Sequence, residues 1–281
     1  MNERQAADID PILEGAGTID LQEEGSRGVL LLHGFGDTPQ TLALLARSLH
    51  SSGYSVLAPL MPGHGRSMAA FTESNADQWL DAARRALTGM RSTHDSVAVV
   101  GLSMGGALSV ILAVEVHAIQ ALVLIAPYIV MPWRLQLAAA THRLWGGVAG
   151  EVNARNPLSI HDPIEREKNL AYGVVTGRML HELWKLMRRA RRSLSAVRAP
   201  ALIIQSREDP RLAPKAAKYT LRNLGSREKR LVWMEGAGHI ITVDYGRERV
   251  FGEVRGWLEM HTRHGATAAP DIRAAVERPE A

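Results

Sequence analysis

The sequence predicts an α/β fold, with a mostly parallel, doubly wound sheet and one helical insertion. Short apolar runs alternate along the chain with stretches of helical spacing, and this alternation favours a parallel sheet covered on both faces. The alternation is interrupted once, between about residues 128 and 197. The chain has 281 residues, close to the roughly 250 to 300 residues at which a single core stops growing. One large domain with an insertion therefore fits both the pattern and the length.

Six apolar runs are each predicted to form a strand buried on both faces. The first, residues 28–33, reads Gly-Val-Leu-Leu-Leu-His and ends at Gly34. Continuous runs rich in branched side chains are typical of strands inside a parallel sheet. The other five runs are residues 55–58, 97–102, 121–126, 201–205 and 230–234.

Five stretches between these runs have the spacing of helices. Residues 38–52 open with Thr38 as a cap and Pro39 at the first helical position, which is a typical helix start. The other four stretches are residues 77–91, 105–116, 214–224 and 246–263. We therefore expect a core of residues 25–127 and 198–264, a helical cap at 128–197, an N-terminal extension at 1–24 and a flexible tail at 265–281.

Composition excludes several kinds of chemistry. The chain contains no cysteine, so disulfides, thiolate zinc sites, iron–sulfur clusters and a cysteine nucleophile are ruled out. His181-Glu182-Leu183-Trp184-Lys185 begins like a zinc motif but ends in lysine, and no phosphate-binding glycine loop is present. We expect no metal and no cofactor. The first residues lack the apolar core of a signal peptide, which predicts a cytoplasmic protein.

Ser103 is the predicted nucleophile. Residues 101–105 read Gly-Leu-Ser-Met-Gly, a G-x-S-x-G pattern between a predicted strand and a predicted helix. A serine at such a tight turn needs a strained backbone, and side chains two residues before or after it would collide with the turn. The turn holds the hydroxyl clear of the sheet beside the amides of a helix N-terminus.

A serine hydroxyl needs a base, and the base needs a carboxylate to orient it. His239 follows a predicted strand on a glycine-rich loop at the sheet edge where open α/β sheets bind ligands. Asp209 follows the preceding strand at the same edge, with Glu208 as the alternative acid. The chain order serine, aspartate, histidine agrees with this assignment. By position, the backbone amides of Phe35 and Met104 would form the oxyanion hole.

Five ordered motifs resemble those of bacterial carboxylesterases and monoacylglycerol lipases of the α/β-hydrolase superfamily. They are residues 30–36, 62–65, 101–106, 205–209 and 238–244. The resemblance implies the α/β-hydrolase fold, ester hydrolysis through an acyl-serine intermediate, and a small helical cap over the site. Ser103, where an aspartate would stand, argues against haloalkane dehalogenases and epoxide hydrolases.

The predicted substrate is a carboxylic ester with an apolar acyl group of short to medium length, monoacylglycerols included. Three tryptophans of the insertion are candidates for substrate binding, Trp133, Trp145 and Trp184, although each could instead pack the cap's own core. The alternatives are another acyl hydrolase, such as a thioesterase, lactonase or amidase, and a non-catalytic ligand-binding protein on the same scaffold.

The net charge of +4 is concentrated in one segment. Residues 178–198 contain seven lysines and arginines but one acid, Glu182. A solvated helix face is the first interpretation of this segment, and contact with a membrane surface is the alternative. We expect the partners to be an ester and water, with no nucleic acid.

Overall fold

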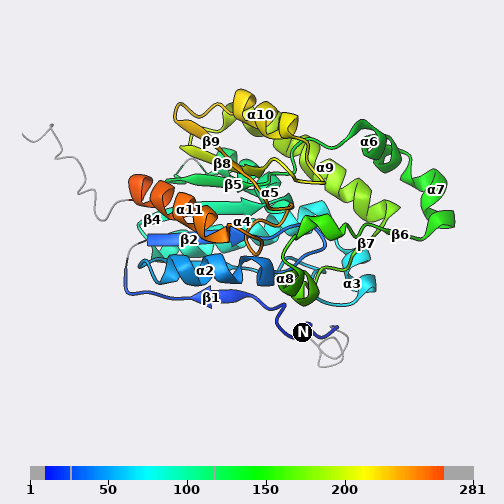
Figure 1. The fold of residues 1–281 in the computed structure, drawn as a ribbon, viewed down its shortest axis with the longest axis horizontal. Coiled ribbons are helices and arrows are strands. Elements are labelled where there is room, and N and C mark those ends of the chain that lie inside the picture. Colours follow the sequence, from blue (N-terminus) through cyan, green and yellow to red (C-terminus); the bar gives the residue numbers. More distant parts are fainter. Residues whose placement is uncertain (1–9, 26, 117, 263–281) are drawn as a thin grey trace, which may run out of the picture.

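The computed structural model describes residues 10–25, 27–116 and 118–262. Its centre is a seven-stranded sheet in the order β1-β3-β2-β4-β5-β8-β9 (Figure 1). All neighbouring strands are parallel except β1, which pairs antiparallel with β3. The strands are β1 (Ile19–Leu21), β2 (Arg27–Leu32), β3 (Ser55–Ala58), β4 (Ser96–Leu102), β5 (Leu122–Ile125), β8 (Ala201–Ser206) and β9 (Lys229–Met234).

All six predicted strands are present, and the predicted fold class is confirmed. The short edge strand β1 was missed because its three residues, Ile-Asp-Leu, are only partly buried and form no apolar run. It lies within the predicted N-terminal extension. The predicted tail at 265–281 falls outside the described residues.

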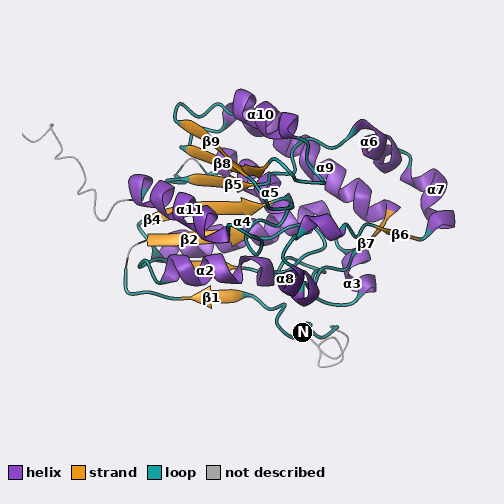
Figure 2. Cartoon of the chain, viewed as in Figure 1, coloured by secondary structure: helices purple, strands orange, loops and turns teal. Residues whose placement is uncertain are grey.

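Helices cover both faces of the sheet, as Figure 2 shows. On one face, α2 (Ala43–His50) and α11 (Arg247–His261) pack with the apolar side chains of the strands into one buried cluster. On the other face, α4 (Ala76–Thr93), α5 (Met104–Glu115) and α10 (Pro214–Asn223) contribute to a second cluster. The short η1 (Pro39–Leu42) and α3 (Met68–Glu73) complete the connections before α4.

The interval between β5 and β8 contains four α-helices. They are α6 (Trp133–Ala140), α7 (His142–Ala149), α8 (Pro163–Lys168) and α9 (Gly177–Ser193), with η2 (Pro157–Ser159) and η3 (Leu194–Ala196) as short turns. A two-stranded antiparallel ribbon, β6 (Glu151–Asn153) with β7 (Val174–Thr176), was missed because it is short and carries no buried run. Within the described residues, no helix is long and apolar enough to cross a lipid bilayer.

The strand order places the site. The chain passes from β2 to β3 on one side and then returns to β4 on the other side of β2. At such a reversal the loops after adjacent strands diverge to opposite faces, which opens a crevice at the carboxyl ends of the strands. The loops after β2 and β4 therefore border one crevice, and those loops carry the predicted oxyanion donors and the predicted nucleophile.

Candidate active site

Ser103 stands at a strained turn between β4 and α5. Its backbone angles are φ 55° and ψ −111°, a region that residues other than glycine rarely adopt. A Cβ atom on Gly101 would lie 2.2 Å from the Gly105 carbonyl oxygen, and one on Gly105 would lie 1.9 Å from the Leu32 oxygen. Backbone contacts therefore require both glycines of the motif, because a side chain on Gly101 would collide with the first turn of α5 and one on Gly105 would collide with β2.

The structure brings Ser103, His239 and Asp209 into one hydrogen-bonded chain. His239 Nε2 lies 2.8 Å from Ser103 Oγ, and His239 Nδ1 lies 2.7 Å from Asp209 Oδ2. All three residues are buried. This pattern corresponds to an imidazole that carries its proton on Nδ1 and offers Nε2 as an acceptor to the hydroxyl.

Asp209 is held in its ionised form by its surroundings. Burial acts to raise its pKa, but the His239 ring and several donors outweigh burial and hold the pKa below its ordinary value. The donors are the Arg211 and Leu212 backbone amides, at 2.8 and 3.0 Å from Oδ1, and the Gln205 side chain, at 2.7 Å from Oδ2. The competing acid Glu208 points elsewhere, because its Oε1 accepts the Gly236 N–H at 2.8 Å.

The loop after β2 lies against the nucleophile. A Cβ atom on Gly34 would be 3.6 Å from Ser103 Cβ, which puts the backbone of this loop beside the serine. His33 fixes the loop, since its Nδ1 donates to the Gly34 oxygen at 2.9 Å and its Nε2 accepts the Met61 N–H at 3.0 Å. Burial lowers the pKa of His33 to about 4, so the ring is neutral near pH 7.

The predicted oxyanion donors flank Ser103 on two elements. Met104 is buried and is the first residue of α5, so its N–H belongs to the unpaired first turn of that helix. Phe35 is half-buried, and its ring packs against Phe71 and Trp79 with ring centres 5.1 and 5.8 Å apart. This aromatic packing holds the Phe35 peptide in the loop that touches the serine.

The three tryptophans are placed differently from one another. Trp133 begins α6 and is 69% exposed. Trp145 donates its Nε1–H to the Ala138 oxygen at 2.8 Å, and Trp184 packs against His181 and Arg188 on its own helix. These contacts all lie within the insertion, so the proposed role of the tryptophans in substrate binding stays a prediction.

Two further residues lie beside the site, and of these Asp37 was missed by sequence reasoning. Asp37 is buried, and its carboxylate would be 3.7 Å from a Cβ on Gly34. Burial raises the pKa of Asp37 to about 6, although hydrogen bonds from Thr38 and Thr41 act to lower it. Tyr128 donates its backbone N–H to the Ser103 oxygen at 3.1 Å. Burial raises the pKa of its phenol to about 12. The one available signal for Asp37 was its position in the loop after β2, at the same sheet edge.

A cavity of about 580 Å³ lies away from Ser103, Asp209 and His239. It is lined by α3, by α7 and by the first residues of α9, among them Thr72, His142 and Arg178. None of its lining residues belongs to the loops of Ser103, Asp209 or His239. Among the residues with described positions, no three or more histidine, aspartate or glutamate side chains cluster as metal ligands would.

Comparison with known proteins identifies the family of this chain. A family model described as serine aminopeptidase, S33, matches residues 24–245, and the chain belongs to this family. It is 29% identical over 254 residues to a thermostable monoacylglycerol lipase of Bacillus sp. (strain H-257), which covers 90% of this chain and 97% of that protein. A carboxylesterase of Bacillus subtilis (strain 168) is 25% identical over 237 residues, covering 84% and 93%.

Solved structures show the same architecture. A structure reported for the metagenome-derived lipolytic enzymes LipS and LipT superposes with a TM-score of 0.82 at 29% identity, covering 89% of this chain and 100% of that chain. A monoacylglycerol lipase of Paleococcus ferrophilus gives a TM-score of 0.75 at 20% identity, covering 87% and 98%, and supports the fold. The protein is thus an α/β-hydrolase of the lipase and esterase type.

Proposed function

We propose that the protein hydrolyses carboxylic esters with apolar acyl groups of short to medium length, monoacylglycerols included, through an acyl-Ser103 intermediate. The observation that carries this proposal is the chain of two hydrogen bonds, 2.8 and 2.7 Å long, from Ser103 through His239 to Asp209. The names of the two Bacillus relatives, monoacylglycerol lipase and carboxylesterase, favour esters over other acyl compounds.

The proposed mechanism begins when Ser103 Oγ attacks the ester carbonyl carbon. His239 Nε2 takes the hydroxyl proton, and Asp209 stabilises the imidazolium and keeps the ring in place. The Phe35 and Met104 amides donate to the oxyanion. The alcohol leaves with the proton from His239, and a water molecule activated by the same nitrogen then releases the acid and regenerates Ser103.

In this proposal, residues 128–197 form a cap over a core of residues 25–127 and 198–264. The cap would supply the apolar wall for the acyl chain, with Trp133, Trp145 and Trp184 as contact residues. The main alternative is another acyl hydrolase, because thioesters, lactones and amides can be opened by the same three groups. The family description, which names an aminopeptidase, makes amides a necessary part of any substrate panel.

The decisive experiment is a panel of p-nitrophenyl esters and monoacylglycerols of increasing acyl length, with matched thioesters and amides. We expect the highest kcat/KM on esters, and a loss of kcat of about 10³-fold or more in Ser103→Ala, because the covalent step is removed. Circular dichroism would establish that the variant stays folded. Unchanged ester hydrolysis by folded Ser103→Ala would overturn the mechanism. A higher kcat/KM on thioesters or amides than on esters would show that the protein acts on that class of substrate instead.

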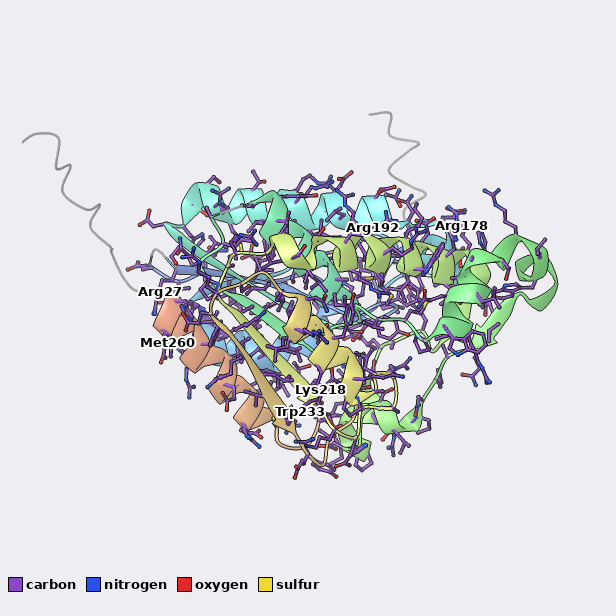
Figure 3. The ribbon with its side chains drawn as sticks, turned by 90° about the horizontal axis from the view of Figure 1, so that it is seen from above. Arg27, Arg178, Arg192, Lys218, Trp233 and Met260 are labelled. Atoms are coloured by element: carbon purple, nitrogen blue, oxygen red, sulfur yellow. The ribbon has the colours of Figure 1, made fainter. Side chains whose placement is uncertain are left out.

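We also propose weak contact of the cap with a membrane surface. Figure 3 labels Arg178 and Arg192 toward opposite ends of α9. Two other cations of this helix are already paired with acids, which makes α9 the weaker candidate for the contact: Lys185 with Glu182 at 2.9 Å and Arg189 with Glu115 at 2.8 Å. Exposed apolar side chains on α6 and α7 favour those helices as the contact, namely Trp133, Leu137 and Leu144, beside Arg134 and Arg143. Sedimentation with anionic vesicles should fall as salt is raised; a salt-independent partition would contradict an electrostatic contact.

A further inference from the structure

Asp244 is a buried carboxylate five residues after His239, and it lies outside the hydrogen-bonded chain described above. Its two oxygens accept four backbone N–H groups. Oδ2 accepts from Gly238 at 2.7 Å and from His161 at 2.8 Å. Oδ1 accepts from Asp162 at 2.9 Å and from Tyr245 at 2.8 Å. The carboxylate therefore bridges the histidine loop and a segment about 80 residues away in the sequence.

We name that distant segment of the insertion, residues 159–162, the return arm. The arm also binds the histidine loop directly, since the Ser159 oxygen accepts the N–H groups of His239 and Ile240, both at 2.9 Å. A Cβ atom on Gly238 would lie 2.2 Å from the Leu158 oxygen. The two backbones are therefore in contact where the histidine is presented to Ser103.

We propose that Asp244 is a positioning residue, which holds the His239 ring in line with Ser103 by tying Gly238 to the return arm. This inference rests on the proposed function. Three consecutive N–H groups around the histidine are held: Gly238 donates to Asp244, and His239 and Ile240 donate to the Ser159 oxygen. Hydrogen bonds from N–H groups to a carboxylate are about twice as strong as neutral ones, so this bridge is stiffer than a loop contact alone. A shift of about 1 Å in a catalytic group can cost about 100-fold in rate.

Asp244 does not compete with Asp209 for the imidazole. Each of its oxygens already accepts two backbone donors, and His239 Nδ1 is 2.7 Å from Asp209. Its effect must therefore pass through the backbone. The same geometry makes one part of the insertion a support for the chemistry, separate from any part that contacts substrate.

The test compares Asp244→Asn with Asp162→Ala. The asparagine keeps the shape but presents an NH₂ group to two N–H donors. The Asp162 carboxylate instead caps α8 through the Ile164 and Glu165 amides and pairs with Arg247 at 3.7 Å. Its removal leaves the four backbone N–H donors of Asp244 in place. With a short soluble ester, we expect kcat about tenfold lower in Asp244→Asn with KM within twofold of the wild type. Asp162→Ala should stay within twofold for both constants.

Three kinetic results would overturn the proposal: an unchanged kcat in Asp244→Asn, a loss confined to KM, or an equal fall of kcat in Asp162→Ala. A second readout is independent of activity. Hydrogen–deuterium exchange at Gly238 should speed up at least tenfold in Asp244→Asn and stay near the wild-type rate in Asp162→Ala; equal exchange in both variants overturns the bridge.

The two proposals fail differently. If Ser103→Ala still hydrolyses esters, the proposed function fails while the exchange measurement still decides the role of Asp244. If Asp244→Asn does not fold, the wild type decides: the Gly238 and His161 amides must exchange on one slow time course, because one carboxylate oxygen holds both. Independent, fast exchange at the two amides would refute the bridge.

Discussion

At the scale of single residues, the turn at Ser103 places the predicted nucleophile on a strained backbone. The serine adopts φ 55° because the chain must leave β4 and enter α5 without a connecting loop. Flanking hydrogen bonds maintain this conformation: Ser103 N–H donates to the Ile125 oxygen at 2.9 Å, and Tyr128 N–H donates to the Ser103 oxygen at 3.1 Å. Neighbouring strands thus stabilise a conformation that the serine alone would avoid.

Asp37 gives a prediction with a definite sign. Its folded pKa, about 6, lies above the ordinary 3.8 because the carboxyl is buried. The folded protein therefore binds this proton more tightly than the unfolded chain, so Asp37 lowers stability as pH rises from about 4 to about 6. Asp37→Asn should therefore resist urea better than the wild type at pH 8. The gain in the free energy of unfolding should be up to about 3 kcal/mol at 1.36 kcal/mol per pKa unit, and it should shrink as pH falls from about 6 to about 4.

The matched control for this change is Asp95→Asn, which alters an exposed carboxylate. Its stability should follow the wild type at every pH within about 0.5 kcal/mol. Parallel urea curves for Asp37→Asn and the wild type from pH 4 to pH 8 would show that the Asp37 carboxyl carries no burial penalty.

At the scale of elements, α9 lies in the insertion by sequence but packs its apolar face against the helices of the core. Leu186 and Met187 are buried in the cluster that also contains the apolar side chains of α4 and α5. By contrast, α6 and α7 extend away from the sheet (Figure 1) and leave Leu144 83% exposed. The insertion is thus packed on the core along α9, whereas α6 and α7 leave apolar side chains exposed to solvent.

This contrast predicts different costs for the same substitution at two leucines of the insertion. Leu186→Ala should lower the free energy of unfolding by about 2 to 4 kcal/mol, because it leaves a cavity between α9 and the core. Leu144→Ala should change it by less than about 0.5 kcal/mol. Urea titration followed by circular dichroism measures both. Similar costs at the two positions would mean that α9 does not pack on the core as described.

At the scale of the whole molecule, the buried titratable groups together set the response to acid. His33 and His64 are both buried with pKa values lowered by desolvation, His33 to about 4. Below pH 6.5 these histidines take up protons in the unfolded chain but stay neutral in the folded protein. They therefore lower the free energy of unfolding as pH falls. Asp37 raises the free energy of unfolding as pH falls from 6 to 4, but this single carboxyl is outweighed by the two histidines.

We therefore expect net stability to fall between pH 6.5 and pH 4. The His33 contribution is about 3 kcal/mol at pH 4, at 1.36 kcal/mol per pKa unit. Urea midpoints measured at half-unit steps of pH would follow this loss. A constant midpoint over this range would contradict the burial of both rings.

The sequence by itself determined the parts of this protein that follow from local chemistry. Apolar runs located the six parallel strands, and the G-x-S-x-G pattern located the turn at Ser103. The same local patterns identified the family resemblance, which the match over residues 24–245 confirms.

Only the tertiary structure decided which side chains meet. Asp209 and Glu208 are adjacent in the sequence, yet Asp209 faces His239 while Glu208 binds the Gly236 amide. Asp244 gains its partners from an arm about 80 residues away, and β1 exists because β3 offers it a free edge. Such contacts depend on how distant segments are brought together at the sheet edge. Local sequence patterns predict the segments themselves, but not the distance between them in space or the direction in which their side chains point.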